Sequence, residues 1–181
     1  MNDINIFTQL IKKDAIVPIQ TDKHGKHYIQ LHEPQCSDSI AIIRNAPSDA
    51  FIIKVDIFRS PEAIFNGSKG ECKRADYVII TAEKKRILYI EIKLNSGHNW
   101  NETVQQLIGA QCFIQYCKEI VKSFWKENKF LTNYEERFIA ISGTHLNKRS
   151  TRPKCEPLGN HNIPQNALKV TSPHNLQFRQ L

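Results

Sequence analysis

Short runs of apolar and β-branched residues, separated by polar turns, predict several β-strands along this chain. The clearest two runs, ADYVIITA at residues 75–82 and RILYIEIK at residues 86–93, are split by the polar residues EKK. Two such runs around a short polar loop are typical of a β-hairpin. Further strands are predicted at residues 27–32, 39–44, 50–58 and 137–142.

Two other segments carry apolar residues at helical spacing, residues 3–13 and a longer stretch from about Trp100 to Trp125. The predicted inner face of the longer helix consists of Val104, Leu107, Ile108, Gln111, Ile114, Cys117 and Val121. The order of helix, strands, long helix and strand predicts an α/β fold with a central mixed β-sheet flanked by α-helices. The long helix would then be the crossover between two parallel strands.

Charged residues interrupt the apolar pattern at one end of the predicted hairpin. Asp76 opens the first strand, and Glu91 and Lys93 close the second. Residues two apart in a strand face the same side of the sheet. A two-residue loop at 83–84 would pair Asp76 with Glu91, whereas a loop one residue longer would shift this pairing. The hairpin is therefore expected to gather these three side chains on one face.

Two carboxylates that face each other repel unless one is protonated or a cation joins them. Their oxygens suit a hard divalent ion such as Mg²⁺ or Mn²⁺, which takes one or two carboxylates and keeps several waters. Lys93 cannot ligate a metal while it is charged, but it can orient a metal-bound water and stabilise charge on a phosphate.

An Asp at the start of one strand, followed by Glu91-Ile92-Lys93 at the end of the next, resembles the signature of the PD-(D/E)XK nuclease superfamily. The resemblance covers residues 50–142 and implies a restriction-endonuclease-like core and a Mg²⁺-dependent nuclease, an endonuclease that cleaves DNA. It implies that Asp76 and Glu91 bind the metal, that the Ile92 carbonyl is a further ligand, and that Lys93 assists the nucleophile. The family's proline is absent, because RAD stands in its place.

The same resemblance implies two further site residues. A glutamine on the following helix would face the site, and Gln105 and Gln106 are the candidates, with Gln106 preferred. A looser parallel to the glutamine and tyrosine of one branch is Gln111 with Tyr116. An additional upstream acid is also expected, and the candidates for it are Asp56, Glu62 and Glu71.

The Glu-x-Lys spacing is weak evidence alone, since it occurs four times, at Glu71–Lys73, Glu83–Lys85, Glu91–Lys93 and Glu127–Lys129. Only the pair at 91–93 ends an apolar strand that follows an acid-bearing strand. The alternative interpretation is a hairpin with polar residues at its solvated end, where Glu91 and Lys93 form an ion pair worth about 0–1 kcal/mol.

Composition is ordinary for a globular protein, with 40% hydrophobic and 24% charged residues, but the net charge of +7 is uneven. Residues 1–145, the predicted nuclease-like domain, carry +2, and residues 146–181 carry +5. This basic, proline-containing C-terminal segment is predicted to pack on the same domain. Its run KRSTRPK supplies the predicted nucleic-acid-binding residues Lys148, Arg149, Arg152 and Lys154, and a solvated loop is the alternative.

The remaining features of the sequence concern the cellular compartment, the partners and the biological role. Five cysteines without a CxxC pair indicate reduced thiols, and no apolar run reaches the length of a membrane span, so a cytoplasmic protein is expected. The expected partner is nucleic acid, DNA rather than RNA, with a homodimer or an ATPase or motor partner also considered and no membrane. Restriction, phage defence and repair all fit this prediction. The alternative function is a catalytically silent module on the same fold that binds nucleic acid or a protein partner.

Overall fold

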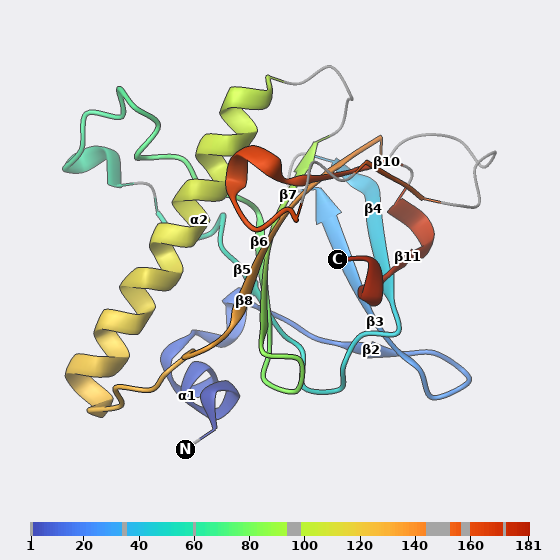
Figure 1. Ribbon diagram of the computed structural model, residues 1–181, viewed down its shortest axis with the longest axis horizontal. Helices are drawn as coiled ribbons and strands as arrows, with labels where there is room; N and C mark the ends of the chain where they lie inside the picture. The colour runs from blue at the N-terminus through green and yellow to red at the C-terminus, as the bar shows by residue number, and fades with distance from the viewer. Residues whose placement is uncertain are drawn as a thin grey trace.

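The protein is built as three layers, with helices on one face of a large sheet and a smaller sheet on the other (Figure 1). Helices α1 (Asp3–Leu10) and α2 (Trp100–Ile120) form the first layer. This computed structural model describes residues 2–33, 36–59, 61–93, 99–143, 153–156, 160–171 and 173–181, with the backbone alone for residues 33, 36–39 and 156. The α/β fold and its mixed sheet agree with the sequence prediction.

The large sheet has seven strands. Their spatial order is β1 (Ile16–Val17), β5 (Phe51–Lys54), β6 (Tyr77–Thr81), β7 (Arg86–Lys93), β8 (Glu135–Ser142), β10 (Leu168–Thr171) and β9 (Lys154–Glu156). Strands β7, β8 and β10 run parallel to one another, and every other neighbouring pair is antiparallel. Helix α2 connects β7 to the parallel strand β8, as the sequence predicts.

The small sheet has four strands in the order β11 (Leu176–Gln177), β4 (Cys36–Arg44), β3 (His27–Glu33) and β2 (Gln20–Thr21). Short helical turns join several elements. They are the 3₁₀ turns Lys13–Ala15, Pro61–Ala63, Pro164–Asn166, Pro173–Asn175 and Phe178–Gln180, and a π-helical turn, Val121–Trp125, that continues α2.

Strand β7 is buried on both of its faces. Ile87 and Tyr89 belong to the core under the helices, whereas Leu88, Ile90 and Ile92 belong to the core under the small sheet. A strand covered on both sides needs apolar residues at successive positions and not at alternate ones. This explains why the run ILYI is continuous, and it makes the charged residues that follow it unusual.

The face that α2 turns to the sheet differs in part from the predicted one. The buried residues of the helix are Thr103, Leu107, Ala110, Ile114 and Cys117, followed by Val121. Ile108, predicted to face inward, is 38% exposed, so that part of the prediction was wrong. The small residues Thr103, Gly109 and Ala110 allow the helix to approach its neighbours closely, while Leu107 and Ile114 fill the core. A Cβ atom on Gly109 would lie 1.8 Å from the Lys73 carbonyl oxygen.

The described parts of residues 146–181 join both sheets, since β9 and β10 extend the large one and β11 extends the small one. Cys112, Cys117 and Cys155 are free thiols. Within the described ranges, no helix is long and apolar enough to cross a membrane.

Candidate functional site

The hairpin of β6 and β7 has the register that the sequence predicts. Tyr77 pairs with Ile90 and Thr81 with Arg86, and the Lys85 N–H donates to the Ala82 carbonyl at 3.3 Å. One further step along this register places Asp76 beside Glu91. The Ile92 N–H donates to Asp76 Oδ2 at 2.7 Å, so a side-chain contact holds Asp76 against the end of β7.

Glu91 and Lys93 form a close ion pair, with Lys93 Nζ 2.7 Å from Glu91 Oε1. The Glu91 side chain is only 1% exposed, whereas that of Lys93 is 22% exposed. A buried carboxylate is costly unless a cation or hydrogen-bond donors compensate its lost hydration. Strand β7 therefore ends in a buried acid whose nearest cation is still reached by solvent.

The carboxylates around Lys93 keep it charged. Burial lowers the pKa of the Lys93 ammonium, but the negative charges of Glu91, Asp76 and Glu102 raise it more, so its net pKa is raised from the usual 10.5. Lys93 is consequently a cation throughout the neutral range. It can donate hydrogen bonds and stabilise negative charge, but it does not act as a base there.

The site lies on the helix-facing side of the large sheet. Side chains alternate along β7, so Glu91 and Lys93 share a face with Ile87 and Tyr89, which pack under α2. Figure 1 shows that the carboxyl end of β7 lies near the start of α2. The contribution of Glu102 to the pKa of Lys93 places the first turn of α2 next to the same end.

Among the glutamines of α2, Gln106 has the surroundings that suit a site residue. Its Oε1 atom is buried and accepts no hydrogen bond from the described part of the chain. Gln105 instead donates to the Lys69 carbonyl at 3.2 Å. Gln111 donates to Glu136 Oε2 at 2.6 Å, and Glu136 also accepts from the Tyr89 hydroxyl at 3.1 Å. Gln105 and Gln111 thus have partners in the fold.

Thr103, three residues before Gln106, has a fully buried hydroxyl with no hydrogen-bond partner in the described ranges. Positions three apart lie on neighbouring parts of one helix surface. The first two turns of α2 therefore bring two buried polar oxygens without partners toward the sheet. Such groups cost free energy unless a water, an ion or a ligand satisfies them.

None of the three candidate upstream acids joins this cluster. Asp56 shares a face with Lys54, whose Nζ lies 3.7 Å away, and that face is opposite to the one that carries Glu91. Glu71 accepts hydrogen bonds from the Gly67 and Lys69 N–H groups and so shapes its own loop. Glu62 is exposed in a 3₁₀ turn.

Glu102 is the nearby acid that the sequence reasoning missed. It lies in the first turn of α2, and its carboxylate is 3.4 Å from Lys73 Nζ. Its position just after the helix start was the only signal in the sequence. The helix dipole alone explains an acid at that position, so the position did not mark Glu102 as a site residue.

The predicted nucleic-acid-binding residues are described only in part, because Lys148, Arg149 and Arg152 lie outside the described residues. Lys154 is exposed on the edge strand β9 and pairs with Thr171. Thr171 pairs with Ser142, which pairs with Lys93. Paired residues share a face, so Lys154 lies on the same face of the sheet as Lys93.

The donor set fits a hydrated Mg²⁺ or Mn²⁺ ion. Asp76 and Glu91 provide two carboxylates, and such an ion keeps several waters that need hydrogen-bond partners of the kind offered by Gln106 and Thr103. In the part of the chain that the structure describes, no three His, Cys, Asp or Glu side chains form a metal-binding group.

Comparisons with family models, with curated proteins and with solved structures found no match to this chain.

Proposed function

We propose that this protein is a metal-dependent nuclease of restriction-endonuclease-like fold that hydrolyses phosphodiester bonds in DNA. The observation that carries the proposal is the meeting of Asp76, Glu91 and Lys93 on one face, at the end of a buried hairpin. Further support comes from the element order β5, β6, β7, α2 and β8, since strand, hairpin, helix and strand follow one another in the region that the family resemblance covers.

In this proposal Asp76, Glu91 and the Ile92 carbonyl hold Mg²⁺ or Mn²⁺. The bound metal would lower the pKa of a water and polarise a phosphoryl oxygen. Lys93, kept cationic by the surrounding carboxylates, would orient the attacking water and stabilise the negative charge that develops on the phosphate. Gln106 would hold the water or the phosphate with its side-chain amide.

The ion pair between Lys93 and Glu91 is part of this mechanism. While it forms, the two charges compensate each other in a buried setting. If Glu91 held a metal ion, the Lys93 ammonium could turn toward the phosphate. The proposal therefore requires that a substrate phosphate can reach Lys93, and the 22% exposure of its side chain meets this requirement.

The test is a cleavage assay with supercoiled plasmid, linear duplex, single-stranded DNA and RNA, each with Mg²⁺, Mn²⁺ or EDTA. Glu91→Gln removes the charge of the buried acid at nearly constant shape. Its matched control is Glu127→Gln in another Glu-x-Lys pair, where the amide oxygen can still accept from the Lys129 N–H. We expect metal-dependent cutting that falls at least 100-fold in Glu91→Gln and stays within twofold in the control. Equal cutting by both variants would contradict the assignment.

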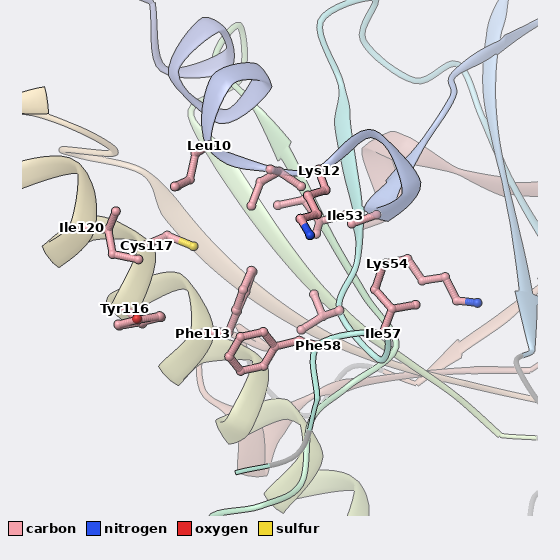
Figure 2. A pocket seen from close by; sticks show the side chains of 13 residues that line it. Leu10, Lys12, Ile53, Lys54, Ile57, Phe58, Phe113, Tyr116, Cys117 and Ile120 are labelled. Carbon is pink, nitrogen blue, oxygen red and sulfur yellow. The ribbon is translucent and has the colours of Figure 1, made fainter. Parts of the chain in front are cut away.

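A second candidate function, a catalytically silent module that binds a protein partner, is favoured by one surface. An apolar pocket of about 290 Å³ opens between α1, the end of β5 and α2. Figure 2 shows Phe58, Phe113 and Tyr116 side by side along it. Ile64 and Phe65 are also exposed and line a neighbouring pocket. This function predicts no metal-dependent cutting of any of the four substrates.

A further inference from the structure

Strand β10 places a second lysine in the same row of the sheet as the acids of the site. Ala140 of β8 pairs with Glu91 on one side and with Lys169 on the other. Paired residues face the same side, so Lys169 points to the helix-covered face. Neighbouring strands lie about 4.8 Å apart, which puts the Cα atoms of Glu91 and Lys169 roughly 10 Å from each other.

The Lys169 ammonium lies against an aromatic ring at the start of α2. Its Nζ is 4.2 Å from the centroid of Trp100, the first residue of the helix. The helix start is fixed by Asn99, whose side chain accepts a hydrogen bond from the Asn101 N–H at 3.1 Å. Lys169 and Trp100 are both half-buried, and Lys169 forms no ion pair with any side chain that the structure describes.

We propose that Lys169 and Trp100 form a nucleotide subsite for an unpaired nucleotide of single-stranded DNA, next to the phosphodiester held at Glu91 and Lys93. A cation over a half-buried ring is held less strongly than one that makes a charge-assisted hydrogen bond to a phosphate. When the ammonium moves to the phosphate, the part of the indole face that it covered can take a base. Bases stack readily on aromatic side chains with little regard to sequence.

This subsite rests on the proposed function and makes it more specific. It predicts which of the candidate substrates is preferred. A base inside a duplex is stacked on its neighbours and cannot also lie on Trp100. The subsite therefore favours single strands, flaps or frayed ends over intact duplex.

The test uses the fluorescence of Trp100 in the full chain. The chain has two tryptophans, so Trp125→Phe leaves Trp100 as the single reporter. Its emission is followed while oligothymidylate of about 12 nucleotides is added in EDTA, where no cutting occurs. We expect saturable quenching by the single strand and at least fivefold weaker quenching by a duplex of equal length.

Variants then distinguish binding through Lys169 and Trp100 from a general effect of lost positive charge. Lys169→Ala is expected to weaken single-strand binding about fivefold or more and to reduce the salt dependence by about one counterion, with partial rescue by Lys169→Arg. In the chain that keeps Trp125, Trp100→Ala is expected to weaken binding about 5- to 150-fold, measured by the anisotropy of a labelled oligonucleotide. Lys129→Ala, an exposed lysine beyond the far end of α2, is the control for lost charge.

No quenching by the single strand would overturn the subsite, and so would a Lys169→Ala effect no larger than that of Lys129→Ala. Because the binding assay needs no metal and no turnover, its result is independent of cleavage. Quenching without cutting would leave the subsite standing and reject the nuclease. Cutting without quenching would reject the subsite alone.

Discussion

Two pairs of an acid and a lysine, each two residues apart, lie at the ends of strands β7 and β5 of the large sheet. They differ in the face they occupy, in their burial and in the charges around them. Glu91 and Lys93 close β7 on the face under α2, with 2.7 Å between their charged atoms and Glu91 1% exposed. Lys54 and Asp56 follow the end of β5 on the opposite face, 3.7 Å apart and 34% and 26% exposed. Figure 2 shows the Lys54 side chain extending away from Phe113 and Tyr116.

The difference lies in what surrounds each pair. Around Lys93, burial lowers the pKa of the ammonium, but the negative charges of Glu91, Asp76 and Glu102 together raise it more. Around Asp56 burial dominates, and the pKa of its carboxyl is raised despite the charge of Lys54. A carboxylate pair with a shared cation can exchange that cation for a metal, whereas a single acid with a raised pKa is a poor ligand.

The largest expected effect on stability comes from removing Lys93, and the matching change at Lys54 is its comparison. Lys93→Ala takes away the cation 2.7 Å from a buried carboxylate, and we expect a loss of about 3 kcal/mol in the free energy of unfolding. Lys54→Ala breaks a more exposed pair and should cost less than about 1 kcal/mol. Urea denaturation of both variants measures the contrast.

The double variant Glu91→Gln with Lys93→Ala separates lost charge compensation from lost packing. It should be more stable than Lys93→Ala alone, because the carboxylate that needs the cation is gone. A double variant as unstable as the single one would mean that the ion pair does not set the burial of Glu91.

A smaller effect on stability is expected from displacing helix α2, which covers the face of the sheet that carries Glu91 and Lys93. In Gly109→Ala the new Cβ would collide with the Lys73 carbonyl oxygen, so α2 and the segment that leads to Asp76 must move apart. We expect a loss of about 2 kcal/mol in unfolding free energy. Gln115→Ala, at an exposed position of the same helix, is the control and should change it by less than about 0.5 kcal/mol. Equal stability of the two variants would show that this close approach is unimportant.

The smallest effect concerns Asp56 and depends on pH. Because its pKa is raised on folding, protonation of Asp56 favours the folded state, and this contribution is complete below pH 3.8 and is lost as the pH rises through the folded pKa. Asp56→Asn removes the charged form, so its Tm relative to the native chain should be higher at pH 7 than at pH 3.5. Thermal melts at the two pH values measure the shift, and a difference that is the same at both would contradict it.

The hairpin could be predicted from sequence because its evidence is local. Strand β7 has the predicted bounds, and the two-residue loop at 83–84, one of the two loop lengths considered, is the one whose register sets Asp76 beside Glu91. Strand β10 could not be predicted in this way. Its four residues alternate apolar and polar side chains, but the run is too short to predict a strand by itself. The strand is held by pairing with β8, which lies far away in the chain.

The residues of the candidate site likewise fall into those that the sequence predicts and those that it does not. Its two acids and its lysine follow from hairpin geometry, whereas Glu102 and Lys169 depend on where α2 and β10 lie in space. The predicted inner face of α2 erred for a related reason. Periodicity favoured the bulky Ile108, but close packing against the sheet and the Lys73 backbone selected Thr103, Ala110 and Gly109.

The most direct test of the central claim compares two isosteric changes, Asp76→Asn and Asp56→Asn, in single-turnover cleavage of the preferred substrate at saturating Mg²⁺. The amide oxygen that Asp76→Asn introduces can still accept the Ile92 N–H, so the fold is preserved while the charge is lost. The account predicts a rate at least 100-fold lower for Asp76→Asn and a rate within twofold of the native one for Asp56→Asn. Equal rates for the two variants would contradict the assignment of the site.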